Sequence, residues 1–488
     1  MSREFLINLI FLLVINAIIK PLYIFGIDRT IQNVVGEDYG IYFSLLSFTY
    51  LFQMINDFGL QNFNARNVSM YPVMINRYFP VITNLKAVLA FLFALLVLLG
   101  AWVIGYELDY IKLLMWLIII QVLTSFLMFL RSNIAGLGHY RIDSLLSIMD
   151  KFLLIVVCGY LLLHSQLREQ FVIEWFLYAQ AGAIAVSVVF ASLFLRPRIQ
   201  FRWQVWDVKM SRIILKQSFP YALIYILMMV YTRIDAVMLE RLLSDGVREA
   251  FTYASAYRLL DAANMVSYLF VGLLLPMFAR MIGKNENIQP LFMTSVKVMA
   301  ISTAVLTVPL LYQSTPIMEL LYYDGDAYSA RLLQLLFLGH ICISFGHIFG
   351  ALMIAEGSIK SLIKVYAVGI VVNLIFNFIL IPEWKALGAA MSTLLTELIV
   401  VGGLAILIYR KFYQLWQPSV IVKITAFGFL CGFTLYTINN ILDLPWAYIY
   451  FMSIAVCIFL AFVLGIVPSR ELLEVMRINQ QLKDKDQD

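Results

Sequence analysis

The sequence predicts an all-α polytopic membrane protein with about 14 transmembrane helices. Three observations predict this class: the composition, the spacing of the apolar runs and the placement of the basic residues. Of the 488 residues, 62% are hydrophobic and 13% are charged, whereas a soluble domain carries about 45–50% apolar and about 25% charged residues. The mean hydropathy is +0.87. The polar side chains are too few to cover a soluble fold, which excludes soluble enzymes, nucleic-acid binders, disordered scaffolds and secreted disulfide-rich modules.

Apolar runs separated by turn residues and charges define the individual spans. A membrane-crossing helix needs about 20 apolar residues, and the chain contains about fourteen such runs. The first run follows the N-terminus without a small-residue cleavage site, so we interpret it as a span and not as a signal peptide. The spans cover roughly residues 4–26, 39–63, 79–105, 110–135, 142–163, 172–195, 218–240, 251–279, 291–313, 331–355, 361–382, 386–409, 419–441 and 445–467.

Lysine and arginine are distributed unevenly between the connections on the two sides of the membrane. An even number of spans puts both termini on one side. The connections on that side carry about nineteen basic residues, against about seven on the other side. The positive-inside rule places the richer side, and therefore both termini, in the cytoplasm.

The longest connection, residues 197–217, divides the spans into two groups. It is basic and contains Trp203 and Trp206, a composition typical of a segment that lies along the membrane surface. We therefore expect two pseudo-symmetric six-helix lobes and two additional C-terminal helices. The predicted domains are an N-terminal lobe at 1–196, the interfacial linker at 197–217, a C-terminal lobe at 218–410, spans 13 and 14 at 411–467, and a cytoplasmic tail at 468–488.

Two stretches about 211 residues apart resemble each other. Residues 37–44 open the second span and residues 248–255 open the eighth, with Asp38/Glu249, Tyr42/Tyr253 and Ser44/Ser255 in register. Six spans separate the copies, so both have the same orientation. Parallel repeats of this kind are typical of transporters with a substrate site between the halves. The match is short, and shared loop chemistry is the alternative explanation.

Nine lysine and arginine residues fall inside the proposed spans. A cation at the centre of a lipid-facing helix costs about 2.5–3.5 kcal/mol, so these side chains are expected to face a protein interior or water. Four stand nearer to span ends, where they can equally reach the membrane surface: Arg131, Lys151, Lys364 and Lys423. The other five are the candidate substrate-binding cations: Arg233, Arg258, Lys20, Lys86 and Lys297.

Fewer acidic residues lie at the same depths, among them Asp150 and Glu356. Asp150 is adjacent to Lys151, and Arg258 and Asp261 stand three residues apart on one helix face. A buried ion pair that binds no ligand can explain any one of these pairs. It does not explain why basic residues inside the spans outnumber acidic ones. A positively lined, water-filled chamber suits an anionic cargo, such as a phosphorylated lipid carrier. The candidate ion-coupling acids are Asp235, Asp261, Glu397 and Asp57.

Other polar residues have structural and functional interpretations that stay open. Asn373 and Asn377 stand at i and i+4, and either line a cavity or join helices by hydrogen bonds. Glu397 is either a protonation-coupled switch or a structural hydrogen-bond donor. His340 and His347 share one helix face and are expected to be core or cavity histidines.

The residue pattern predicts no catalytic residue, metal site or cofactor. No set of side chains has the spacing of metal ligands. The four cysteines lie in apolar runs and are expected to act as small hydrophobic residues. They are Cys158, Cys342, Cys431 and Cys457.

Several short motifs carry a resemblance to a known family. They are Asp57-Phe-Gly-Leu60 with Asn64-Ala-Arg66, Arg131 through Gly136-Leu-Gly-His-Tyr140, Arg233-Ile-Asp-Ala-Val-Met-Leu239 with Tyr253, Arg258-Leu259 and Pro276, and Ala355-Glu-Gly357 with Lys360, Asn373, Asn377, Ile381-Pro382 and Leu387-Gly-Ala-Ala390 through Glu397. Their order and spacing resemble the polysaccharide exporters of the multidrug/oligosaccharidyl-lipid/polysaccharide exporter superfamily.

The resemblance implies a Wzx-type polysaccharide or O-antigen flippase of the bacterial cytoplasmic (inner) membrane. Such a protein moves an undecaprenyl-pyrophosphate-linked oligosaccharide to the outer leaflet by alternating access, with ion exchange as the expected driving force. Cavity cations are implied to hold the pyrophosphate and sugars, here Arg233 and Arg258, with Lys20 and Lys86. The implied partners are the polyprenyl-pyrophosphate-linked glycan and membrane lipid, with polysaccharide polymerase machinery as a candidate, and no nucleic acid.

Two other classes remain as alternatives. A small-molecule or drug antiporter of the same superfamily would carry cations and favour an acidic cavity, which the deep lysines and arginines argue against. A glycan polymerase, glycosyltransferase or acyltransferase, the last using His340 or His347, would need a sizeable extracytoplasmic loop. The outer connections are short, and the most acidic lies around Asp324-Gly-Asp326.

Overall fold

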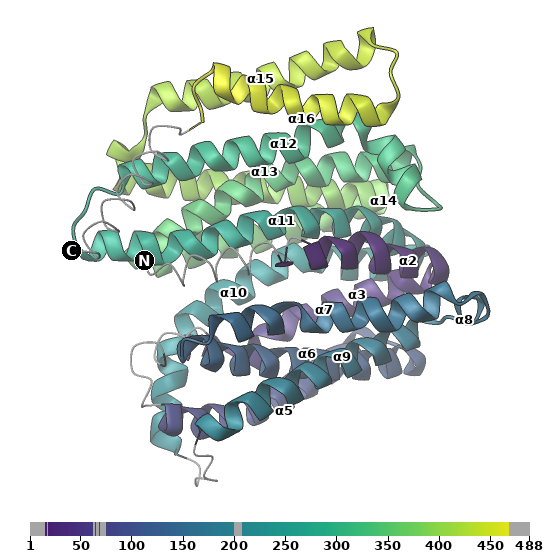
Figure 1. The fold of residues 1–488 in the computed structure, drawn as a ribbon, viewed down its shortest axis with the longest axis vertical. Helices are drawn as coiled ribbons and strands as arrows, with labels where there is room; N and C mark the ends of the chain where they lie inside the picture. Colours follow the sequence, from purple (N-terminus) through teal and green to yellow (C-terminus); the bar gives the residue numbers. More distant parts are fainter. Residues whose placement is uncertain are drawn as a thin grey trace. The chain divides into compact units, whose positions relative to one another are not determined.

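The computed structural model describes residues 15, 16, 18–61, 64, 68, 75–199 and 207–467. Within these residues all regular secondary structure is helical (Figure 1). The predicted all-α fold is confirmed. The N-terminal start, Arg66, the segment with Trp203 and Trp206, and the predicted tail at 468–488 lie outside the described residues.

The first helical segment runs further than the sequence predicts. Residues 18–21 are helical, and the π-helix η1 (Leu22–Asp28) and helix α2 (Arg29–Val35) follow without interruption. The predicted first span ended at residue 26. Asp28 therefore lies within the helix, where it is buried and accepts hydrogen bonds from Tyr39 at 2.8 Å and Tyr23 at 3.4 Å.

The other helices follow in chain order and are joined by short connections. Before the linker they are α3 (Asp38–Asp57), α5 (Ile75–Ile104), α6 (Leu108–Gly136), α7 (Tyr140–Leu163), α8 (Ser165–Glu169), α9 (Ile173–Leu195) and the 3-10 turn η3 (Arg196–Arg198). After it they are α10 (Val208–Leu242), α11 (Gly246–Gly283), α12 (Gln289–Leu321), α13 (Ala327–Glu356), α14 (Ile359–Lys411), the 3-10 turn η4 (Tyr413–Leu415), α15 (Pro418–Ile441) and α16 (Trp446–Val463).

Ten helices of the described part are long and apolar enough to cross a membrane. The eleventh and twelfth predicted spans both lie within α14. They are two helical segments that meet at a break in the backbone at Lys385 (φ 52°, ψ −130°). Large apolar side chains stay exposed on the helices, among them Phe91, Trp102 and Phe429. A surface of this kind needs lipid around it, and the chain is therefore a multi-pass membrane protein.

Helix α10 begins inside the segment that the sequence assigned to the linker. The side chain of Asp207 accepts a hydrogen bond from the backbone N–H of Met210 at 2.9 Å, which caps the helix N-terminus. Residues 208–217 are therefore helical and continuous with the following span. The interfacial position of the linker stays a prediction.

The chain divides into two compact units. Unit 1 comprises the residues up to Ser255 together with Leu321–Tyr323 and Asn377–Ala389. Unit 2 comprises Ala256–Leu320, Asp324–Phe376 and the residues from Ala390 onward. Unit 1 thus includes α10 and the first turns of α11. The division of the chain into two six-helix lobes, one on each side of the linker, stays a prediction.

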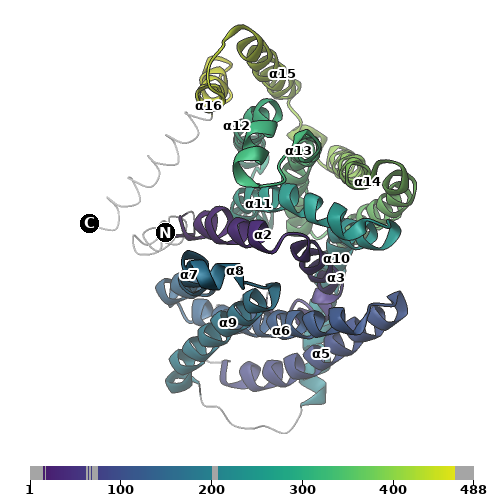
Figure 2. The same ribbon diagram turned by 90° about the vertical axis from the view of Figure 1, so that its right-hand side faces the viewer.

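In unit 1, α3 packs against α5, α6 and α10, and α9 packs against α6 and α7. Figures 1 and 2 both show α6 and α9 side by side. Helix α3 also approaches the start of α11 closely, because a Cβ atom on Gly40 would lie 2.4 Å from the carbonyl oxygen of Val247. The two stretches that resemble each other in sequence, 37–44 and 248–255, thus lie against one another.

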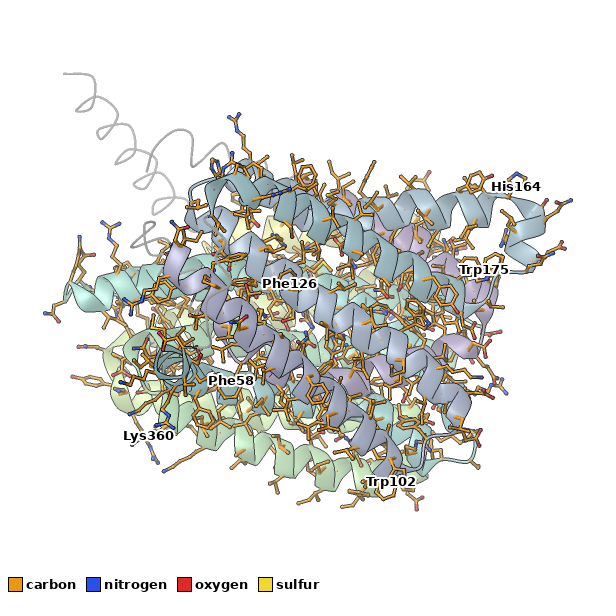
Figure 3. The ribbon with its side chains drawn as sticks, turned by 90° about the horizontal axis from the view of Figure 1, so that it is seen from below. Phe58, Trp102, Phe126, His164, Trp175 and Lys360 are labelled. Atoms are coloured by element: carbon orange, nitrogen blue, oxygen red, sulfur yellow. The ribbon has the colours of Figure 1, made fainter. Side chains whose placement is uncertain are left out.

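The helices of unit 1 alternate in direction (Figure 3). Trp102 near the end of α5, His164 after α7 and Trp175 near the start of α9 lie toward one end of the unit. Phe58, which follows α3, lies toward the opposite end. This alternation is what consecutive membrane crossings require.

In unit 2, α12 contributes to a buried apolar cluster with α15 and α16. Val308, Phe427, Cys431 and Cys457 belong to this cluster. All four cysteines of the chain are buried with free thiols, in agreement with their predicted use as small hydrophobic residues.

Candidate functional site

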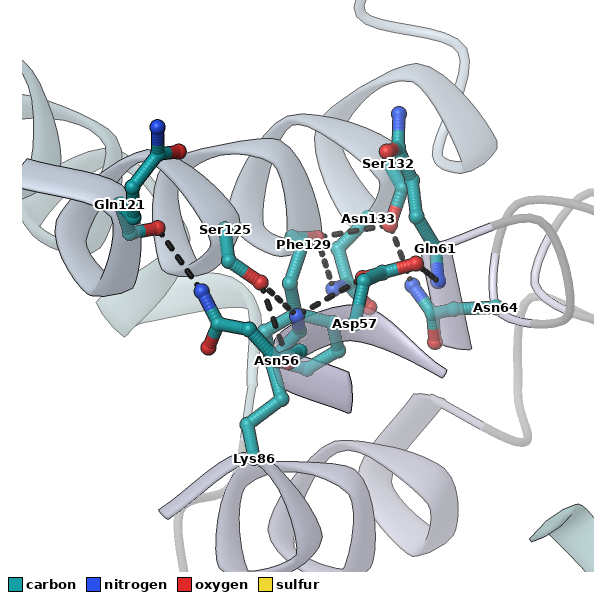
Figure 4. Close-up of polar contacts among 10 residues, drawn as sticks. All are labelled: Asn56, Asp57, Gln61, Asn64, Lys86, Gln121, Ser125, Phe129, Ser132 and Asn133. Atoms are coloured by element: carbon teal, nitrogen blue, oxygen red, sulfur yellow. Dashed lines mark hydrogen bonds and ion pairs between the residues drawn. The ribbon is translucent and has the colours of Figure 1, made fainter. Parts of the chain in front are cut away.

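Lys86 lies in a buried polar network where α3, α5 and α6 meet (Figure 4). Its ammonium lies 2.9 Å from Asp57 Oδ1 and donates to Ser125 Oγ at 2.7 Å. Asn56 Nδ2 donates to the carbonyl oxygen of Gln121 at 2.9 Å. A buried charge is stable only when it is paired and hydrogen-bonded. The predicted substrate-binding cation Lys86 and the predicted ion-coupling acid Asp57 therefore neutralise each other.

The network continues along α6 beyond the end of α3. Asn64 Nδ2 donates to Ser132 Oγ at 2.8 Å, and Asn133 Nδ2 donates to the carbonyl oxygen of Phe129 at 2.8 Å. Ser125 and Ser132 were not among the residues predicted from the sequence. The signal was present, because these serines stand seven residues apart and so share one face of the helix.

Lys20, Arg131 and Lys151 come together in unit 1. The electrostatic neighbours of Lys20 include Arg131, Asp150 and Lys151. Lys151 lies near the middle of α7, and the interpretation that its side chain reaches the membrane surface stays a prediction. Its ammonium lies 3.2 Å from Asp150 Oδ2 and 4.8 Å from the centroid of the Tyr23 ring.

Asp235 of α10 is 1% exposed and has polar partners within unit 1. It accepts hydrogen bonds from Asn377 Nδ2 at 2.7 Å and from the Tyr253 hydroxyl at 3.2 Å. Two residues earlier, the guanidinium carbon of Arg233 lies 5.1 Å from the centroid of the Tyr50 ring, a cation–π contact. Asn377, a candidate cavity residue, thus meets a candidate ion-coupling acid.

The remaining candidates belong to unit 2. Arg258 Nη1 lies 3.9 Å from Asp261 Oδ2, which confirms the pairing expected from their spacing. Lys297 lies on α12, and Glu397 lies buried on α14. The five predicted cations are therefore divided between the units, with Lys20, Lys86 and Arg233 in unit 1. A single chamber lined by all five stays a prediction.

The two histidines of α13 have neighbours on α11. His340 Nδ1 lies 2.9 Å from Asn264 Oδ1, and the ring of His347 lies 4.7 Å from that of Tyr268. Ser392 Oγ donates to the carbonyl oxygen of Asn373 at 3.1 Å, so Asn373 does form a structural hydrogen bond. Among the described residues, no group of three His, Cys, Asp or Glu side chains is placed to hold a metal ion.

One charged cluster in unit 1 was missed by sequence analysis. Glu240 Oε2 accepts a hydrogen bond from the Tyr106 hydroxyl at 3.1 Å and from Ser44 Oγ at 3.4 Å. The guanidinium carbon of Arg241 lies 3.6 Å from the centroid of the Tyr106 ring. Burial, and then the charge of Glu240, raise the pKa of the Tyr106 phenol. The sequence placed Arg241 in a loop because the predicted span ended at residue 240.

A second ionic cluster lies at the break in α14 and was also missed. Lys385 Nζ donates to Asp245 Oδ2 and lies 3.6 Å from Glu249 Oε1, and the backbone N–H of Ala386 donates to Glu249 Oε2 at 3.2 Å. The hydrogen bond from Lys385 lowers the pKa of Asp245. These residues all belong to unit 1.

A family model described as polysaccharide biosynthesis protein matches residues 6–282. The chain belongs to this family. The matched region runs through all of the described unit 1 helices from η1 to α10 and through α11 nearly to its end. Membership of the polysaccharide biosynthesis family confirms the resemblance that the sequence motifs indicate.

One relative with a more specific name also matches part of this chain. A Shigella dysenteriae protein named for O-antigen transport is 28% identical over 196 residues. The match covers 38% of this chain and 46% of the relative, so it spans less than half of the relative's length.

Solved structures share the fold. The lipid II flippase MurJ, in an inward closed conformation, matches with a TM-score of 0.68 and 13% identity over 94% of this chain and 100% of the other. An inward-facing multidrug resistance MATE family transporter of the MOP superfamily matches with a TM-score of 0.62 and 12% identity over 80% and 94%. At these identities the likeness establishes the fold alone.

Proposed function

We propose that this member of the polysaccharide biosynthesis family is a flippase for a polyprenyl-pyrophosphate-linked oligosaccharide. The observation that carries the proposal is the family match over residues 6–282, combined with a multi-pass fold like that of a lipid II flippase. The flippase works in the bacterial inner membrane with both termini in the cytoplasm. It delivers complete repeat units for the assembly of a surface polysaccharide, where polymerase machinery is a candidate partner.

The charged residues inside the spans support an anionic cargo. In the proposed mechanism, Arg233 of unit 1 and Arg258 of unit 2 are each candidate ligands of the pyrophosphate, because guanidinium groups form paired charge-assisted hydrogen bonds with phosphate oxygens. Lys297 contributes further positive charge. The sugars cross through a water-filled chamber as it opens first to the cytoplasm and then to the outside, while the lipid tail stays in the bilayer.

Ion exchange drives this cycle in the proposal, and Asp235 is its first candidate site. Its carboxylate is buried between an amide and a phenol, Asn377 and Tyr253. A carboxylate at that depth is costly unless it binds a proton or a cation or keeps such polar partners. Asp261 and Glu397 are the alternative sites in unit 2, and Asp57 is the weaker one in unit 1, because Lys86 neutralises it.

A small-molecule antiporter is the second candidate function, favoured by the fold shared with MATE transporters. The excess of cations over acids inside the spans argues against cationic drugs as cargo. The two functions also predict different effects of deletion.

The test is deletion of the protein in its own cell, followed by analysis of lipid-linked and surface glycans. The expected result is loss of surface polysaccharide and accumulation of complete repeat units on the lipid carrier, reversed by the wild-type protein. Truncated units on the carrier would instead indicate an enzyme that builds the glycan. An unchanged glycan with altered drug tolerance would establish the antiporter.

A further inference from the structure

We propose that the first turns of α10 form a binding surface for the headgroups of acidic phospholipids. The surface consists of Lys209, Arg212 and Lys216, bordered by exposed apolar side chains. It concerns the lipid that surrounds the protein and not the cargo, so the inference stands independently of the proposed function.

Helix α10 is longer than a membrane crossing requires. Its 35 residues extend over about 52 Å at about 1.5 Å per residue, whereas the hydrocarbon core of a bilayer is about 30 Å thick. The part that is apolar enough to cross this core is Ala222–Leu242. The preceding turns, which begin at Val208, therefore reach the headgroup region on one side of the membrane. The predicted orientation places that side in the cytoplasm.

One face of these first turns packs against the rest of unit 1. Ser211, Ile214 and Ser218 are buried, and they stand at i, i+3 and i+7 on one side of the helix. A Cβ atom on Gly59, just after α3, would lie 3.2 Å from the carbonyl oxygen of Ser218. The chain at the end of α3 therefore covers this face and orients the first turns of α10.

The other face carries a basic stripe. Lys209, Arg212 and Lys216 are exposed and also stand at i, i+3 and i+7, nearly opposite the buried face at about 3.6 residues per turn. Asp207 is the one acidic residue between positions 207 and 234, and its carboxylate already caps the helix N-terminus. Within the part of the chain that the structure describes, the three cations form no ion pair. Their charges are therefore available to anions outside the protein.

Apolar side chains border the basic stripe. Val208, Ile213 and Phe219 are 60%, 52% and 50% exposed. Exposed apolar groups next to cations are typical of helices at the membrane interface, where lysine and arginine stems lie along the acyl chains and their charged ends reach the phosphates. Anionic headgroups attract basic residues at this level. A bilayer with acidic lipid satisfies both kinds of side chain, whereas a free phosphate satisfies the cations alone.

The first test compares lipid compositions with the purified full chain in nanodiscs. The discs contain either phosphatidylcholine alone or a mixture of phosphatidylcholine and phosphatidylglycerol. Phosphatidylglycerol should raise the Tm of the wild type, because a ligand of the folded state stabilises it, and high salt should reduce this increase. The variant Lys209→Gln/Arg212→Gln/Lys216→Gln should have lost most of the increase. An equal increase in the variant and the wild type would overturn the surface.

The second test measures binding of a fluorescent short-chain phosphatidylglycerol to the full chain in a neutral detergent. Lys209→Gln and Lys216→Gln should each raise the Kd about fivefold. Lys112→Gln is the matched control with unchanged Kd, because Lys112 is 77% exposed and pairs with Asp109. Lys209→Arg/Lys216→Arg keeps the charge and should bind as the wild type does. If the wild type binds phosphatidylglycerol no more tightly than phosphatidylcholine, the proposal is wrong and the basic stripe faces solvent or a soluble partner.

Discussion

At the scale of single residues, the charges inside the helices of unit 1 differ in the partners that surround them. Lys86 has a carboxylate and a hydroxyl within hydrogen-bond distance, whereas Lys20 has two cations and one acid among its neighbours. The first arrangement gives a buried charge its counter-charge, whereas the second places like charges near each other, which is costly. The carboxylate beside Lys86 thus makes this lysine part of a structural ion pair.

Asp57→Asn tests the structural interpretation of the Lys86 pair. It leaves the Lys86 ammonium buried without its counter-charge, which should cost about 3–5 kcal/mol of folding stability. The measurement is thermal or denaturant unfolding in detergent. The double variant Lys86→Gln/Asp57→Asn should recover much of the loss. Equal stability of Asp57→Asn and the wild type would show that the pair contributes nothing.

Asp245 gives a pH-dependent prediction. Its pKa is lowered by the hydrogen bond from Lys385, so the folded state binds protons less readily than the unfolded state. The resulting stability is present above the unfolded pKa of about 4 and is lost as the pH falls through the lower folded value. The Tm advantage of the wild type over Asp245→Asn should be small and constant near pH 7, and should shrink below pH about 4. An advantage that grows on acidification would contradict this assignment.

At the scale of the elements, the contact between α3 and the start of α11 depends on a glycine. A Cβ atom on Gly40 would lie 2.4 Å from the Val247 carbonyl oxygen and 2.8 Å from the Phe251 amide nitrogen. Both are backbone atoms and cannot rotate away. The two elements approach this closely only because residue 40 has no side chain.

Gly40→Ala should therefore lower the Tm and reduce the yield of folded protein. Gly182→Ala in α9 is the matched control, because nothing lies within 4 Å of its Cβ position. Alanine favours a helix over glycine by up to about 1 kcal/mol, so the control should be neutral or more stable. If both variants behave alike, the close approach of α3 and α11 is not a determinant of stability.

At the scale of the whole molecule, the predicted orientation can be checked by labelling introduced cysteines. Glu107→Cys, between α5 and α6, should react with an impermeant maleimide in intact cells. Lys284→Cys, after α11, should react only after the membrane is opened. The four native cysteines are buried, so background labelling should be low. The opposite pattern would place both termini outside the cytoplasm.

The proposed cargo predicts how two arginines affect export. Arg233→Ala with Arg258→Ala should abolish surface polysaccharide while the protein still reaches the membrane. Arg233→Lys with Arg258→Lys should keep part of the export, because the charge remains and the paired hydrogen bonds do not. Glycan analysis of complemented deletion cells gives the result. Full export by the double alanine variant would exclude these arginines as pyrophosphate ligands.

Much of the architecture could be predicted from the sequence, because lipid imposes a simple rule on it. Each crossing needs a long apolar helix, and the predicted spans from the third onward overlap described helices. The boundaries were less accurate where a helix continues through polar residues. The first helix runs to Val35, and α10 begins at Val208. Apolar runs mark where lipid begins, whereas backbone hydrogen bonds determine where a helix ends.

The sequence by itself determined the membrane class, the family and the surplus of cations within the spans, since these follow from composition and from residue order. Only the tertiary structure decided which charges are neutralised. Asp57 meets Lys86 across 29 positions of the chain, and Asn377 meets Asp235 across 142. The sequence gives no measure of those distances, because side chains far apart in the chain become neighbours only when helices pack. The same packing leaves Lys20 beside two other cations.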